Sequence, residues 1–179
     1  MKSLPLSVAV MALAALGSQL LPPGPAPAAA FAWLVHWSLM AAADFALPRR
    51  LPDAAGPLRF TVSGHQGALY RVTLHRWLGV GAFGRLLERT GWNTLVRSAR
   101  GYGGGRRGLP QLAEQTWRSE LGHVWALLTA LALSAVLLCL HQPEATFWLV
   151  ALAAPLHLYP ALLQRHVRAR IQRLGAQRG

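Results

Sequence analysis

The residues best suited to chemistry lie together in one short stretch of the chain, residues 117–125. Glu120 and His123 are three positions apart, so a helix places them on one face, and Arg118 precedes them. A carboxylate that hydrogen-bonds an imidazole fixes its tautomer and raises its basicity, which suits a general base acting on a hydroxyl group. A guanidinium suits the binding of a phosphate or a developing oxyanion. The alternative interpretation is a charge-compensated helix terminus with a partly buried histidine.

Other kinds of active site find little support in the sequence. A zinc site requires three or more protein ligands. The stretch supplies two at most, and neither HxxxH nor HExxH occurs, so we expect no metal and no other cofactor. The single cysteine, Cys139, lies inside an apolar run, which predicts a small buried hydrophobic residue and not a nucleophile. Ser119 lacks the GxSxG pattern of a hydrolase, and residues 101–108 lack the order of a phosphate-binding loop.

The composition indicates a membrane protein. The 179-residue chain is 53% hydrophobic and 13% charged, whereas soluble domains carry about 25% charged residues. Four apolar runs, near residues 4–21, 28–47, 121–141 and 145–163, approach the roughly 20 residues that cross a bilayer. They predict an all-α integral membrane protein of one domain, residues 1–179, with four transmembrane helices arranged as two hairpins. A cleaved signal peptide is the competing interpretation of the first run.

The basic residues predict the orientation of these helices. Of the 18 Lys and Arg, 12 lie in residues 48–118 and 5 in the tail from residue 164 onward, against 6 Asp and Glu in the whole chain. The turns at residues 22–27 and 141–145 contain neither Lys nor Arg. The positive-inside rule therefore predicts a multi-pass protein of the cell membrane, with both termini and the central region in the cytoplasm. The apolar runs favour anionic lipid over nucleic acid as the partner of this positive charge.

The central region, residues 48–118, differs from the apolar runs in its arginines and glycines. Val80, Phe83 and Leu87 share one helical face while the arginines fall elsewhere. This pattern is typical of an amphipathic helix that lies in the membrane interface. The tail, residues 164–174, predicts a basic helix on the cytoplasmic side.

In this topology three helix ends reach the cytoplasmic membrane surface. We expect Glu120 and His123 to face Arg165 across the second hairpin, although Glu120 has His123, Arg118 and Arg165 as alternative partners. His36, within the second run, is interpreted as a polar contact between helices. The polar residues expected at the cytoplasmic surface are Asp44, Arg49, Arg50, Arg118, Glu120, His123, Gln164, Arg165 and Arg168.

Two separate stretches resemble motifs of the glycosyl-4,4'-diaponeurosporenoate acyltransferase family. Residues 114–123 are similar to its "ET.RAE..H" element, and residues 159–170 to its closing "lP.ii.QRYNR.RL" element. The resemblance covers about residues 110–174. The chain departs from the family pattern at residues 166–167, where His-Val replaces Tyr-Asn, and at Leu78, where the family has lysine.

The resemblance implies an enzyme of carotenoid biosynthesis that esterifies the sugar of a carotenoid glycoside with a fatty acyl chain. In our interpretation His123 is the base, Glu120 orients it, and the other matching residues bind the substrates. The acyl donor, an acyl-CoA or acyl carrier, would reach the site from the cytoplasm, and the acceptor would be a glycosylated lipid or carotenoid. The competing hypothesis is a non-catalytic membrane scaffold that binds anionic lipid through its arginines. The matching positions are Arg118, Glu120, His123, Gln164, Arg165, Arg168 and Arg170.

Overall fold

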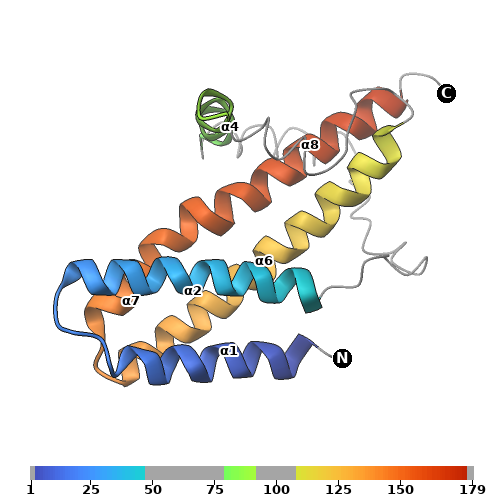
Figure 1. Ribbon diagram of the computed structural model, residues 1–179. Helices are drawn as coiled ribbons and strands as arrows, with labels where there is room; N and C mark the ends of the chain where they lie inside the picture. The colour runs from blue at the N-terminus through green and yellow to red at the C-terminus, as the bar shows by residue number, and fades with distance from the viewer. Residues whose placement is uncertain (1–2, 47–78, 92–107, 177–179) are drawn as a thin grey trace. The chain divides into compact units, whose positions relative to one another are not determined.

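The computed structural model describes residues 3–46, 79–91 and 108–176, and the regular elements in these ranges are all helices (Figure 1). The prediction of an all-α protein is therefore confirmed for this part of the chain. The chain divides into two compact units, one of residues 1–47 and 118–161 and one of residues 48–117 and 162–179. The elements are α1 (Ser3–Ser18), α2 (Pro25–Ala46), α4 (Val80–Arg89), α6 (Leu109–Cys139), α7 (Pro143–Ala153), the π-helix η3 (Ala154–Leu158) and α8 (Tyr159–Ala176).

Three of the helical segments are long and apolar enough to cross a membrane. They cover Pro25–Phe45, Gln111–Cys139 and Pro143–Arg168, which confirms the second, third and fourth predicted runs as apolar helices of spanning length. The first run forms the 16-residue helix α1, about 24 Å long at 1.5 Å per residue. This length falls short of the roughly 30 Å hydrocarbon core, because Pro22, Pro23 and Gly24 stop the helix early.

Helix α6 extends well beyond the apolar run of residues 121–141 on its N-terminal side. It is a single helix of 31 residues from Leu109, because residues 111–118 are rich in the helix formers Gln, Leu, Ala, Glu and Arg, and Pro110 lies in its first turn, where proline is tolerated. Glu120 and His123 therefore lie inside a long helix. The alternative interpretation of this stretch as a charge-compensated helix terminus is therefore wrong.

The last apolar run remains helical in spite of two prolines. Pro155 and Pro160 each lack an N–H, and each ring would clash with the carbonyl four residues earlier in a regular α-helix. The chain widens locally into η3, where the N–H of Tyr159 donates to the carbonyl of Ala154, five residues earlier. Helical structure thus continues from Pro143 to Ala176. Such π-helical turns occur frequently at functional sites.

Small side chains let the helices of the first unit approach closely. Alanines recur at intervals of four residues, as in Ala28 and Ala32 of α2 and Ala126 and Ala130 of α6, a pattern that favours tight packing of helices in lipid. α2 packs against both α1 and α7. The core shared by the four helices is formed by Ala14, Ala28, Ala32, Val35, Leu39, Ala126, Ala130, Leu133, Leu137, Ala145 and Leu149.

The two turns of the first unit lie at the same end of it. The backbone N–H of Gly24 donates to Oε2 of Glu144 at 3.1 Å, which joins the α1–α2 turn to the start of α7. At the end of α6, His141 adopts a left-handed conformation with φ 56°, and the N–H of Gln142 donates to the carbonyl of Leu137. This is the usual way in which a helix C-terminus satisfies its last carbonyls.

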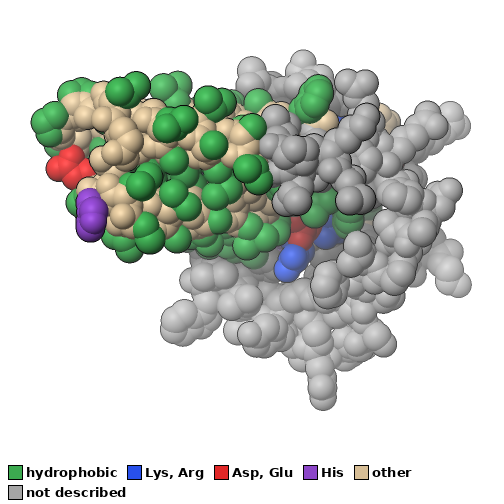
Figure 2. Space-filling view, turned by 90° about the horizontal axis from the view of Figure 1, so that it is seen from below, with side chains coloured by type: hydrophobic (Ala, Val, Ile, Leu, Met, Phe, Trp, Pro, Cys, Tyr) green, Lys and Arg blue, Asp and Glu red, His purple; other side chains and the backbone are tan. Residues whose placement is uncertain are grey.

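The outer surface of the first unit is largely apolar. Figure 2 shows hydrophobic side chains over much of its described surface on this face, and large ones such as Leu34, Trp37, Leu128 and Phe147 are exposed. Such a surface suits lipid. Cys139 is also exposed, so the prediction of a buried cysteine is wrong. Leu137 takes the core position, and a residue two positions further along a helix faces away.

In the second unit, α4 is an amphipathic helix, as predicted for its residues. Val80 is buried, whereas Arg85 and Arg89 are exposed. The side chain of Leu163 lies beside Gly84. Residues 48–78 and 92–107 of the predicted central region lie outside the described residues.

Candidate functional site

Two histidines from distant parts of the sequence form a hydrogen-bonded pair inside the first unit. Nδ1 of His36, on α2, lies 2.7 Å from Nε2 of His157, in η3. Nε2 of His36 lies 3.0 Å from the carbonyl oxygen of Leu149, on α7. The two side chains are 1% and 0% exposed. The interpretation of His36 as a polar contact between helices is thus confirmed.

The carbonyl of Leu149 fixes the direction of the hydrogen bonds in this pair. A carbonyl oxygen only accepts, so Nε2 of His36 carries the hydrogen and donates to it. Nδ1 of a neutral His36 is then an acceptor, so His157 donates to it from Nε2. Nδ1 of His157 consequently carries a lone pair. This buried nitrogen makes no hydrogen bond of regular geometry among the described residues, although the backbone of Leu156 interacts with the ring.

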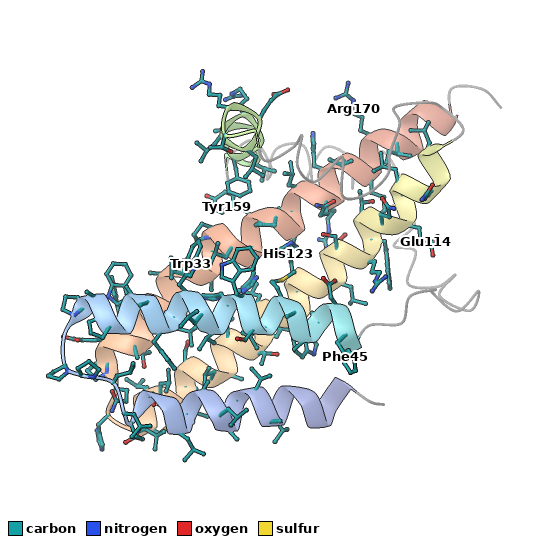
Figure 3. The ribbon with its side chains drawn as sticks, in the orientation of Figure 1. Trp33, Phe45, Glu114, His123, Tyr159 and Arg170 are labelled. Carbon is teal, nitrogen blue, oxygen red and sulfur yellow. The ribbon has the colours of Figure 1, made fainter. Side chains whose placement is uncertain are left out.

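His123, on α6, lies beside this pair. Its ring centroid is 5.9 Å from that of His157, with the ring planes inclined by 46°, so α2, α6 and η3 together bring three histidines to one place. Figure 3 shows His123 on the inner side of α6 in this unit. Glu120, one turn earlier on the same helix, is 7% exposed. Buried ionisable groups in an apolar helix are costly and mark functional sites.

Arg118 holds the end of α2. Its Nη2 donates to the backbone carbonyl of Asp44 at 3.3 Å. The last carbonyls of a helix lack partners and attract cations, so this contact stabilises the C-terminus of α2. The side chain of Asp44 is exposed. Nε of Arg118 is buried, with no hydrogen-bond partner in the part of the chain that the structure describes.

The remaining predicted site residues lie on α8, in the second unit. Arg165 and Arg170 are exposed, whereas Gln164 and Arg168 are partly buried. Arg165 and Arg168 are three positions apart and thus share a helical face. The predicted pairing of Glu120 and His123 with Arg165 joins residues of different units, and it stays a prediction.

Sequence reasoning singled out His123 but missed its histidine neighbours as parts of one site. His36 and His157 are separated by 121 residues, so no local spacing reveals the pair. The available signal was weaker: each is an isolated polar residue in an apolar run, and His157 lies between Pro155 and Pro160. Among the described residues no cluster of three or more His, Cys, Asp or Glu has the arrangement of a metal site.

Comparison with known proteins bears on the same residues. The family model described as glycosyl-4,4'-diaponeurosporenoate acyltransferase matches residues 65–177, which include Glu120, His123, His157 and the arginines of α8. No curated protein and no solved structure was found to match the chain. At the level of the family, the match indicates an acyltransferase that acts on a carotenoid glycoside. Because the matched region covers more than half of the sequence, the chain belongs to the glycosyl-4,4'-diaponeurosporenoate acyltransferase family.

Proposed function

We propose that the protein transfers a fatty acyl group from a thioester donor to a sugar hydroxyl of a lipophilic glycoside, with a carotenoid glycoside as the acceptor. One observation carries the proposal: the buried Glu120 lies one turn from His123 in the interior of an apolar helix, within the region that matches the family. The same helix face adjoins two further histidines. A scaffold that only anchors itself in lipid has no need of these costly buried groups.

The proposed reaction uses His123 as a general base. Its imidazole takes the proton of the acceptor hydroxyl while the oxygen attacks the carbonyl carbon of the thioester. The tetrahedral intermediate then collapses and expels the thiolate, which receives the proton from the imidazolium. One ester bond forms and one thioester bond breaks, with no net oxidation or reduction. Glu120 orients the imidazole and stabilises its protonated form.

The arginines have the chemistry to bind the acyl donor. Acyl-CoA and acyl carriers both bear phosphate, which guanidinium groups bind through paired hydrogen bonds. Arg165 and Arg168 are assigned to this phosphate, with Gln164 and Arg170 beside them on α8. Arg118 is assigned with them to the anionic head of the donor, because its position on α6 is turned away from that of His123.

The proposal includes a topology of four spans in one membrane domain, with both termini and the basic central region in the cytoplasm. The bond between Gly24 and Glu144 supports it, because it joins the two turns that lack Lys and Arg. Fusion of a reporter that is active only in the cytoplasm tests the orientation. Activity is expected after residue 179 and not when the reporter is inserted at residue 142. The reverse pattern would refute the orientation.

The catalytic proposal is tested in membranes supplied with a labelled long-chain acyl-CoA and a carotenoid glucoside. His123→Ala should lower ester formation by about 10²-fold or more, the usual contribution of a general base. Glu120→Gln should lower it by a smaller factor. His141→Asn is the matched control, because His141 is exposed in a turn where asparagine tolerates the left-handed backbone. Undiminished ester formation by both the His123 and Glu120 variants would refute their catalytic roles. Ester formation no greater than in membranes without the protein would favour the scaffold hypothesis.

A further inference from the structure

His157 is a buried residue to which the proposed reaction gives no role so far. Its Nε2 is used by His36, and its Nδ1 is an acceptor that makes no hydrogen bond of regular geometry among the described residues. A buried polar atom left in this state is costly, and so calls for an explanation. Besides His36, the ring of His123 lies beside that of His157, with the centroids 5.9 Å apart.

We propose that His157 is a positioning residue for acyl transfer, and that its Nδ1 accepts the N–H of His123. The bond would hold the ring of His123 with its other nitrogen unprotonated and directed at the acceptor hydroxyl. When that nitrogen takes up the proton, the same bond stabilises the imidazolium, together with the negative charge of Glu120. In this arrangement His157, and not Glu120, accepts the N–H and sets the orientation of the ring. This inference rests on the proposed function, because it assigns His157 a role through His123.

The rings of His123 and His157 lie slightly too far apart for this hydrogen bond in the observed structure. The centroids of His36 and His157, which are hydrogen-bonded at 2.7 Å, are 4.7 Å apart. Those of His123 and His157 are 5.9 Å apart, about 1 Å farther. Catalytic hydrogen bonds are often long in the absence of substrate and shorten when it binds. The proposal requires a side-chain rotation of His123 that closes this gap.

His36 gives the chain of hydrogen bonds its direction. Because the carbonyl of Leu149 holds the hydrogen of His36 on Nε2, His157 is held with its own hydrogen on Nε2 and its lone pair on Nδ1. His36 lies outside the matched residues 65–177. Helix α2 of this chain therefore completes a site whose other members lie within the family region.

Two substitutions of His157 separate positioning from a purely structural role. In asparagine, the side-chain oxygen branches from Cγ like Nδ1, so His157→Asn keeps an acceptor toward His123. In glutamine, the terminal amide reaches the position of Nε2, so His157→Gln keeps a partner for His36. If His157 acts only by holding His36, the glutamine variant should retain more activity than the asparagine variant. If His157 positions His123, the asparagine variant should retain more activity.

The variants are compared as full-length protein in lipid nanodiscs, with a long-chain acyl-CoA and a carotenoid glucoside as substrates. For His157→Gln, kcat should fall by about tenfold or more while KM stays within about twofold, the pattern for a group that acts in the transition state. His157→Asn should retain several times more kcat than His157→Gln. If the glutamine variant equals or exceeds the asparagine variant while His123→Ala is inactive, this inference is refuted and the proposed function stands. If His123→Ala is as active as the wild-type protein, the assignment of His123 as the base fails, and this inference fails with it.

A spectroscopic measurement does not depend on activity or on whether the variants fold. Nitrogen-15 chemical shifts of labelled histidine distinguish protonated from unprotonated ring nitrogens. In the wild-type protein, His157 should carry its hydrogen on Nε2 and none on Nδ1. Its resonances are assigned by their loss in His157→Phe. If that variant fails to fold, sequential backbone correlations assign them. A hydrogen on Nδ1 of neutral His157 would overturn the proposal, since that nitrogen could not accept a bond from His123.

Discussion

Removing both members of the histidine pair should cost less stability than the sum of the two single removals. The change to test is phenylalanine at His36, at His157 and at both positions, because phenylalanine keeps an aromatic ring of similar width without its nitrogens. The single variants leave a buried nitrogen of the other ring unsatisfied, whereas the double variant leaves none in the pair. Burying an unpaired polar group costs about 1–3 kcal/mol, whereas replacing both partners by apolar groups is nearly neutral.

The magnitudes follow from the bonds lost. His36→Phe removes the bonds to His157 and to Leu149, of 2.7 and 3.0 Å. Hydrogen bonds between helices in a membrane contribute about 0.6 kcal/mol on average and about 1–2 kcal/mol in model peptides. With the unsatisfied Nε2–H of His157 included, we expect a loss of about 2–3 kcal/mol. His157→Phe removes only the first bond and should cost about 1–2 kcal/mol.

The double variant should then be more stable than the sum of the single effects implies, with a coupling of about 1–2 kcal/mol. The assay is reversible unfolding of the purified protein in mixed micelles, followed by circular dichroism across a denaturant series. Phe substitution at the exposed His141 is the control and should show no coupling to either histidine. Additive single effects, within about 0.5 kcal/mol, would refute the reasoning that the two rings satisfy each other.

Three further predictions concern the frame around the site and use the same unfolding assay. Arg118→Met should lower stability by about 0.5–1 kcal/mol because it removes the cation at the C-terminus of α2, and Arg118→Lys should recover part of the loss; equal losses would argue against a charge effect. Ala32→Leu should cost about 1–3 kcal/mol by overpacking the core, whereas Leu34→Ala on the exposed side of α2 should cost much less. His141→Gly should raise stability by about 0.5–1 kcal/mol by relieving its left-handed conformation, and an unchanged or lower stability would contradict this.

The helices could be predicted from the sequence because apolar runs report membrane spans directly. The expected runs 28–47 and 145–163 correspond closely to α2 and to the helical segment that begins at Pro143. The full length of α6 was harder to predict: residues 109–120 are polar but have high helix propensity, so hydropathy identifies only the part of the helix from residue 121 onward. For the first run, hydropathy instead predicted too long a helix. The apolar residues extend beyond the point at which proline and glycine end α1.

The site could be predicted only in part from the sequence, because residues that are neighbours in sequence point in different directions on a helix. At about 100° per residue, Glu120 and His123 are separated by about 60° around α6, and their shared face follows from their spacing. Arg118 is about 160° from Glu120 by the same rule, which is why it reaches the end of α2.

The histidine neighbour of His123, which is His157, could not be found in this way. Helix packing, and not spacing along the chain, brings the two rings together. His157 enters the interior from a π-helical turn, where the usual period of 3.6 residues does not apply. Its acceptor nitrogen is defined only once α2 supplies His36 and α7 supplies the carbonyl of Leu149. Under the proposed mechanism, the basicity and orientation of His123 depend on α2, α7 and η3. A substitution of His36 in α2 should then lower the rate of acyl transfer through its effect on His157.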